Sequence, residues 1–99
     1  MAKGPLSGVK VLEYCSFIAG PYCTKLLADL GAEVIKVEKP EGDVARKHGP
    51  FLHNEPNPEC SSVFLYNNTN KMGVTLNLES PTGREIFKKL AAQADILLE

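Results

Sequence analysis

The pattern of apolar and polar positions predicts a strand, a helix and a second strand within the first 38 residues. Residues 9–15 (VKVLEYC) alternate over a strand-like length, and residues 33–38 (EVIKVE) are rich in β-branched side chains. Between them, residues 21–30 read as a helix, with Pro21 at the first helical position and Gly31 just past the end. Apolar side chains recur there at three- and four-residue spacing, which predicts a buried face of Tyr22, Cys23, Leu26, Leu27 and Leu30. A unit of this kind implies parallel strands joined by a right-handed crossover.

The next stretch has a different character. Residues 39–62 contain four prolines and show no periodicity, so we expect a long structureless loop. Loops of this length are uncommon in compact domains and usually close over a ligand or a partner chain. Residues 63–68 (VFLYNN) are expected to form a brief ordered piece at its end.

A second strand–helix–strand pattern follows the loop. Residues 72–78 alternate like a half-buried strand, and Ser80 and Pro81 suit the cap and first turn of a helix. The predicted buried face of this helix is Ile86, Phe87, Leu90, Ala91 and Ala94. Residues 95–99 begin another strand. Two such units leave too few helices to cover both faces of a parallel sheet, so we interpret residues 1–99 as part of a larger α/β domain in a longer protein.

Composition excludes several classes of partner. Eleven Lys and Arg residues against twelve Asp and Glu residues give a net charge of −1, which argues against nucleic acid and anionic membranes. No apolar run reaches the roughly 18–20 residues that span a bilayer, and the N-terminus lacks a signal-peptide pattern. We therefore expect a cytoplasmic protein, with mitochondria and peroxisomes as open alternatives. Three cysteines without C-x-x-C spacing predict neither a disulfide scaffold nor a metal site.

The turn after the first strand, residues 16–23 (SFIAGPYC), lies where a dinucleotide fold carries G-x-G-x-x-G. Only Gly20 is present, and Phe17 and Ile18 would crowd a buried pyrophosphate. Glu38 has the spacing of a ribose-binding acid, but one such match is a weak signal, so we do not expect NAD binding.

The same turn suits a different ligand. It lies at the carboxyl edge of a parallel sheet, where open α/β folds bind ligands, and Phe17, Ile18 and Ala19 offer an apolar ledge with backbone donors. Three nearby cations could hold a nucleotide with an additional phosphate, such as coenzyme A; they are Lys39, Arg46 and Lys71. The alternative, which composition alone favours, is that all three are solvated loop residues.

The loop carries further polar residues without an evident catalytic role. His48 and His53 have no partner at ligand-like spacing. Asp43 is expected to cap or turn the chain after Gly42, because catalysis would need a second positioned group that we do not find.

Several blocks of the sequence resemble the N-terminus of the class III CoA-transferases. These blocks are PLSGVKVLEY (5–14), AGPYCTKLLADLGAEVIKVEKPEGDVAR (19–46), NKMGVTLNL (70–78) and GREIFKKLAAQADILLE (83–99). The family includes formyl-CoA transferase, carnitine CoA-transferase and bile-acid-inducible protein F, with α-methylacyl-CoA racemase as a relative. The resemblance covers only the opening quarter or so of a typical member.

The resemblance implies a Rossmann-like large domain that binds CoA, in an interlocked homodimer. Family transferases move CoA from an acyl-CoA to a carboxylic acid through an aspartyl anhydride and then an aspartyl-CoA thioester. Matched by position, residues 17–19 lie along CoA, Lys39 lies near its phosphates, and Arg46 is a frequent loop arginine of less certain role. The adenine is expected to pack at the end of the third strand, on Leu76, Asn77 and Leu78.

This chain also departs from the family pattern. The family often has Arg-Ser at residues 72–73 and Asp-Leu-Lys at residues 77–79, so two expected cations are missing here. Lys39 stands where Arg is more usual, which keeps the charge but loses bidentate geometry. The resemblance places the catalytic aspartate beyond residue 99, so we assign no catalytic residue. Two alternatives stay open: an acyl-CoA racemase, and a non-enzymatic α/β binding module.

Overall fold

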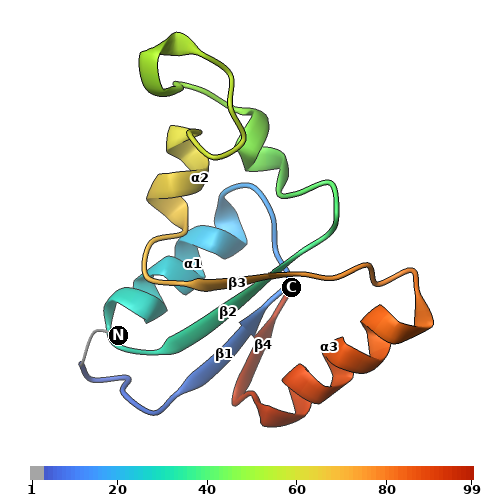
Figure 1. The fold of residues 1–99 in the computed structure, drawn as a ribbon. Helices are drawn as coiled ribbons and strands as arrows, with labels where there is room; N and C mark the ends of the chain where they lie inside the picture. Colours follow the sequence, from blue (N-terminus) through green and yellow to red (C-terminus); the bar gives the residue numbers. More distant parts are fainter. Residues whose placement is uncertain (1–3) are drawn as a thin grey trace.

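The computed structural model describes residues 4–99 and shows an α/β fold (Figure 1). The elements in chain order are β1 (Lys10–Glu13), α1 (Ala19–Asp29), β2 (Glu33–Glu38), α2 (Ser62–Asn67), β3 (Met72–Thr75), α3 (Pro81–Gln93) and β4 (Ile96–Leu98). All four strands are parallel, in the order β3-β2-β1-β4. The predicted fold class, α/β with a parallel sheet, is therefore confirmed.

Register places two kinds of side chain on opposite faces of the sheet. Val11 pairs with Val34, and both side chains join Ala28 and Ala32 in a buried core beneath α1. The neighbouring positions Leu12 and Ile35 point to the other face, because strand residues alternate. There they line a cavity together with Leu90 and Ala94 of α3, which lies beside β4 (Figure 1).

The helix α1 has the predicted period but a different buried face. Tyr22, Leu26 and Leu30 are 41%, 44% and 47% exposed, whereas Thr24 and Ala28 are buried. The chain approaches closely here: a Cβ atom on Gly20 would lie 2.6 Å from the sulfur of Cys15. At so short a distance no side chain fits at Gly20, and the start of α1 lies close against the turn after β1, while Tyr22, Leu26 and Leu30 face outward. Of the predicted face, Leu27 packs against the core.

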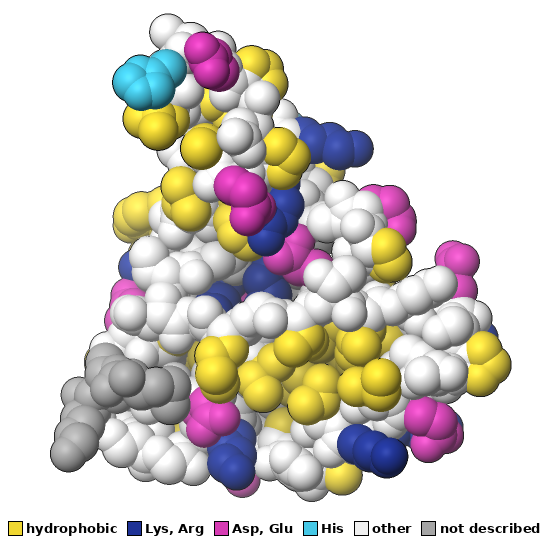
Figure 2. Space-filling model, viewed as in Figure 1, with side chains coloured by type: hydrophobic (Ala, Val, Ile, Leu, Met, Phe, Trp, Pro, Cys, Tyr) yellow, Lys and Arg dark blue, Asp and Glu magenta, His cyan; other side chains and the backbone are white. Residues whose placement is uncertain are grey.

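The helix α3 begins as predicted. Ser80 is the N-cap, its Oγ accepts a hydrogen bond from the Gly83 amide at 3.0 Å, and Pro81 follows in the first turn. Of its predicted face, Ile86 is exposed, while Phe87, Leu90, Ala91 and Ala94 are half-buried. Beside α3 the sheet face is open, and Figure 2 shows hydrophobic side chains gathered between β3 and α3. The exposed sheet residues on this face are Met72, Val74 and Leu97.

The long loop is more ordered than predicted. It contains two short 3₁₀ helices, Val44–Lys47 and Leu52–Asn54, and α2 follows at residue 62. Asp43 caps the first of them, because its Oδ1 accepts from the Ala45 amide at 2.8 Å, so its predicted capping role is confirmed. The buried Ser61 hydroxyl donates to the Ala45 carbonyl at 2.7 Å and ties the end of the loop to its beginning.

The strand predicted at residues 72–78 is shorter than expected. β3 ends at Thr75, although the Leu76 amide still donates to the Glu38 carbonyl at 2.9 Å. The chain then turns through residues 77–80 into α3. None of the helices within residues 4–99 combines the length and the apolarity needed to cross a membrane.

Candidate functional site

Two adjoining cavities lie at the carboxyl ends of β1, β2 and β3. The smaller holds about 170 Å³ and is lined by residues of the two turns that follow β1 and β2: Tyr14, Cys15, Ser16, Val37, Glu38, Lys39, Gly42 and Asp43. The larger holds about 320 Å³ and is lined by Tyr14, Lys39, Pro40, Glu41, Asn77, Leu78 and Glu79. Because Tyr14 and Lys39 line both, we treat the two cavities as one carboxyl-edge groove. It lies where open α/β folds bind ligands.

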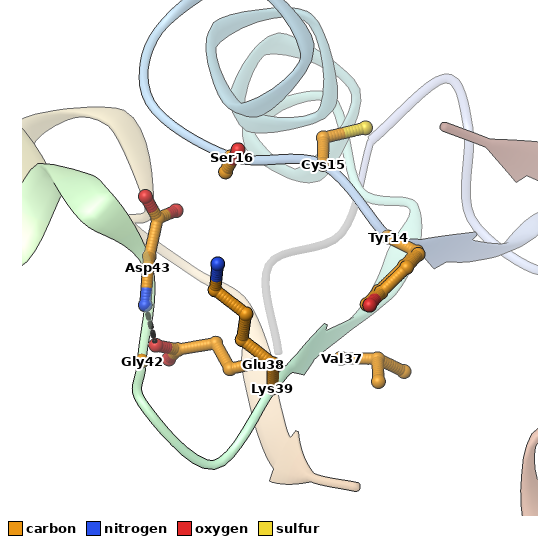
Figure 3. A pocket seen from close by; sticks show the side chains of 8 residues that line it. All are labelled: Tyr14, Cys15, Ser16, Val37, Glu38, Lys39, Gly42 and Asp43. Atoms are coloured by element: carbon orange, nitrogen blue, oxygen red, sulfur yellow. Dashed lines mark hydrogen bonds between the residues drawn. The ribbon is translucent and has the colours of Figure 1, made fainter. Parts of the chain in front are cut away.

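Lys39 is the cation of this groove. Figure 3 shows its side chain extending from the end of β2 into the space between Ser16, Asp43 and Tyr14. Lys39 is exposed, and among residues 4–99 its ammonium group makes no ion pair. The opposite wall is aromatic: the Tyr14 ring meets the edge of the Phe87 ring, with centroids 5.9 Å apart. A free cation beside an apolar wall suits a ligand with both a phosphate and a ring.

The predicted ledge of residues 17–19 adjoins the groove without lining either cavity. Phe17 has a φ of +69°, and Ile18 is the N-cap of α1 with no side-chain hydrogen bond to the first turn. The side chains of Phe17, Ile18 and Ala19 are exposed. The amides of the first helical turn have no acceptor within a helix, and Pro21 has no amide hydrogen, so the amides of residues 19 and 20 are the ones that α1 offers to solvent or a ligand.

A buried cluster of charges lies beneath this turn, on the α1 side of the sheet. Lys36 Nζ is 3.0 Å from Glu13 Oε2 and 2.8 Å from Asp43 Oδ2, and Lys71 Nζ is 2.8 Å from Glu13 Oε1. The Thr24 hydroxyl also donates to Glu13, at 2.7 Å. Two carboxylates thus balance two ammonium groups away from water, which is the condition under which buried charges are tolerated.

Lys71 is therefore neither a solvated loop residue nor free to bind phosphate. Its ammonium group donates to the Pro21 carbonyl at 3.0 Å and to Asn68 Oδ1 at 2.6 Å, besides pairing with Glu13. Burial lowers the pKa of Lys71 below its ordinary value, and the contact with Glu13 only partly offsets this. Both interpretations of Lys71, as a cation that holds a phosphate and as a solvated loop residue, were therefore wrong.

Arg46 is also engaged within the chain. Its guanidinium donates to both oxygens of Glu38, at 2.8 and 2.7 Å, pairs with Glu59, and lies 3.7 Å from the centroid of the Phe64 ring. The hydrogen bonds that Arg46 donates to Glu38 raise the pKa of Arg46 above its ordinary value. Arg46 thus fixes the loop against β2. Its predicted contact with CoA stays a prediction.

The carboxylates Glu38 and Asp43 predict an acid-sensitive fold. Burial raises the pKa of each carboxyl, but the contacts with Arg46 (for Glu38) and with Lys36 (for Asp43) lower it by more. The pKa of Glu38 therefore lies below its ordinary 4.5, and that of Asp43 below its ordinary 3.8. Their stabilisation is present above these ordinary values and is lost as the pH falls below them. Urea unfolding should give a lower free energy of unfolding at pH 3 than at pH 7, and Asp43→Asn should shrink that difference. An unchanged difference in the variant would contradict the assignment.

Comparison with known proteins decides the family. The sequence profile of CoA-transferase family III matches residues 6–99. The chain belongs to CoA-transferase family III. The predicted membership is thereby confirmed.

Two relatives illustrate how close the match is. This CoA-transferase family III chain is 46% identical over 93 residues to (R)-2-hydroxy-4-methylpentanoate CoA-transferase of Clostridioides difficile, covering 94% of this chain and 23% of that protein. It is 45% identical over 97 residues to succinyl-CoA:glutarate CoA-transferase of Homo sapiens, covering 96% of this chain and 21% of that protein. The chain thus spans between a fifth and a quarter of these relatives.

Solved structures agree on the fold. A CAIB/BAIF family protein from Brucella suis superposes with a TM-score of 0.84 at 39% identity, covering 95% of this chain and 25% of that chain. A hypothetical protein (Rv3272) from Mycobacterium tuberculosis superposes with a TM-score of 0.82 at 40% identity, covering 97% and 25%. The α/β arrangement described above is therefore that of the family.

Sequence reasoning found part of the site in this family III chain and missed part of it. The structure brings Lys39, Asn77 and Leu78 to one groove, as predicted for neighbouring strand ends. It leaves Leu76 half-buried beside β2. The buried partners Glu13 and Lys36 were missed. Both stand two positions after a buried valine on the same strand face, so alternation alone could have shown that they point inward.

Proposed function

We propose that this chain is the CoA-binding N-terminal portion of an enzyme that transfers CoA from an acyl-CoA to a carboxylic acid. The observation that carries the proposal is the unpaired Lys39 ammonium group in the carboxyl-edge groove. The relatives support it, since their names describe CoA transfer, and one of them names succinyl-CoA and glutarate.

The groove offers distinct surfaces to distinct parts of CoA. We assign the phosphates to Lys39, because an ammonium group binds phosphate as a point charge. We assign the adenine to the larger cavity, where Leu78 and the Tyr14 ring provide apolar contact, with Leu76 and Asn77 on the same segment. We assign the pyrophosphate and the pantetheine arm to the exposed residues 17–19 and to the free amides at the start of α1. Arg46 contributes by holding the loop in place.

Asp43 is a carboxylate in the groove, yet its contacts make it a poor nucleophile. Its Oδ1 accepts from two backbone amides and its Oδ2 lies 2.8 Å from Lys36. Hydrogen bonds and an ion pair of this kind stabilise the carboxylate and reduce its reactivity. The aspartyl intermediate that the resemblance implies is therefore assigned to a residue outside this chain.

The open apolar surfaces support a role within a larger protein. Tyr22, Leu26 and Leu30 on α1 and Met72 and Val74 on β3 are exposed among the described residues. Large exposed apolar patches usually mark interfaces. We propose that the remaining parts of an enzyme of its relatives' length cover them, within the interlocked homodimer that the resemblance implies.

Replacing Lys39 tests the phosphate assignment. Lys39→Ala should weaken CoA binding by about tenfold or more, because a hydrogen bond to a charged group contributes roughly 1.5–3 kcal/mol. Titration calorimetry on the full-length protein that carries this chain measures this, and dephospho-CoA, which lacks the 3′-phosphate, shows which phosphate Lys39 holds. Lys47→Ala is the matched control, because Lys47 is exposed and lines neither cavity of the groove. Equal losses in both variants would contradict the assignment.

The transferase proposal is tested with the full-length protein that carries this chain. We expect CoA exchange between an acyl-CoA donor such as succinyl-CoA and a free carboxylate, followed by liquid chromatography of the thioesters. Exchange of the substrate's α-hydrogen for deuterium, without acyl transfer, would favour the racemase alternative and overturn the proposal.

A further inference from the structure

The turn that follows β1 contains a backbone conformation that needs outside support. Phe17 has a φ of +69°, in the left-handed region that a bulky L-residue rarely adopts. This residue stands immediately before Ile18, the N-cap of α1. The orientation of the amides at the start of α1, and of the exposed ledge, therefore depends on what holds Phe17 in place.

The backbone of Phe17 is held by a residue of another segment. The Phe17 amide donates to Asp43 Oδ1 at 2.9 Å, and the same oxygen accepts from the Ala45 amide at 2.8 Å. One carboxylate oxygen thus joins the turn after β1 to the loop after β2. The side chain of Phe17 is also in contact with the loop: its ring packs against the His48 ring, with centroids 4.8 Å apart.

Asp43 itself is fixed from several sides. Its side chain is buried, Oδ2 lies 2.8 Å from Lys36 Nζ, and its amide donates to Glu38 Oε2 at 2.7 Å. Lys36 in turn donates to the Cys15 carbonyl at 3.1 Å. The Lys36–Asp43 ion pair thus holds the turn after β1 at two points, the Cys15 carbonyl and the Phe17 amide. Asp43 is therefore rigid enough to impose a conformation on Phe17.

We propose that Asp43 is a positioning residue for CoA binding, which holds the Phe17 backbone so that the ledge and the amides at the start of α1 face the ligand. The inference rests on the proposed function and adds to it a residue that acts on CoA binding through the backbone of Phe17. Its two oxygens have separable roles: Oδ1 sets the turn, whereas Oδ2 neutralises Lys36.

Two substitutions at Asp43 separate these roles. Asp43→Asn keeps an oxygen that accepts from the Phe17 and Ala45 amides but loses the ion pair with Lys36. Asp43→Ala loses both. We expect Asp43→Ala to weaken CoA binding by about tenfold, since the left-handed conformation is disfavoured without its partner, and Asp43→Asn by no more than about threefold. Amide hydrogen exchange at Phe17 should quicken in the alanine variant alone.

Ser61→Ala is the control for a merely structural role. Ser61 is buried and ties the same loop together through the Ala45 and His48 carbonyls, but its hydroxyl does not take part in the hydrogen bond that holds the Phe17 amide. It should lower the free energy of unfolding while leaving CoA affinity and Phe17 exchange unchanged. A Phe17→Gly background adds a second check, because glycine adopts positive φ readily, so Asp43→Ala should then cost less affinity than it does beside Phe17.

The outcomes distinguish the inference from the proposed function. If the full-length protein that carries this chain, with Asp43 unaltered, fails to bind CoA, the proposed function fails. If it binds CoA while Asp43→Ala binds as tightly as Ser61→Ala, or keeps a protected Phe17 amide, the positioning role is overturned and the proposed function stands. Should Asp43→Ala not fold, Asp43→Ala and Asp43→Asn are compared in a Lys36→Met background, which removes the charge that Oδ2 neutralises. Weaker CoA binding in the alanine variant than in the asparagine variant supports the role, and equal affinity contradicts it.

Discussion

Replacing Glu13 by alanine should lower the free energy of unfolding by about 3–5 kcal/mol, which is a large part of the stability of a small domain. Glu13 is fully buried, and its two oxygens contact Lys36, Lys71 and the Thr24 hydroxyl. The substitution leaves two ammonium groups in a space without water and only one carboxylate, Asp43, beside them. Urea denaturation followed by circular dichroism measures the loss.

The control for this prediction is Glu85→Ala, the same substitution at an exposed position on α3. It should change the free energy of unfolding by no more than about 0.5 kcal/mol. A loss at Glu13 that is as small as this would mean that water reaches the cluster. The charges would then behave as surface ion pairs, and the buried cluster described above would be contradicted.

Gly83→Ala should disturb both stability and the groove. Gly83 lies in the first turn of α3, and a Cβ atom there would lie 2.7 Å from the backbone carbon of Asn77 and closer still to its oxygen. Backbone atoms cannot move aside alone, so the 77–80 turn must shift, at a cost of about 1–3 kcal/mol. Because Asn77 and Leu78 line the larger cavity, CoA affinity should fall as well, which titration calorimetry would show.

Gly73→Ala is the matched control for Gly83. An added Cβ there meets no atom within 4 Å, and Gly73 does not have a positive φ. The control should leave both stability and CoA affinity nearly unchanged. If Gly83→Ala bound CoA as tightly as Gly73→Ala, the larger cavity would not be the adenine site.

Much of the fold follows from local patterns, and the errors arise where distant segments meet. The periods of residues 21–30 and 86–94 predicted both helices, because amphipathic spacing depends only on the helix itself. Which face of α1 turns inward depended on the close approach at Gly20, and spacing does not reveal that. As a result Tyr22 and Leu26 were placed inside although they are exposed.

The candidate site shows the same division. Lys39 and Leu78 could be placed together because parallel strands end at one edge of a sheet. The partners of Arg46 and Lys71 could not be predicted, since Glu38 and Glu13 reach them only after the loop and α1 have packed. Strand alternation would have placed Glu13 and Lys36 inside, and an inward-facing charge in a short strand calls for a partner.

A crystal structure of the chain with CoA tests the central claim most directly. We expect a CoA phosphate within hydrogen-bonding distance of the Lys39 ammonium group and the adenine in the larger cavity, against Leu78 and Tyr14. CoA bound instead on the open sheet face beside α3, away from Lys39, would contradict it.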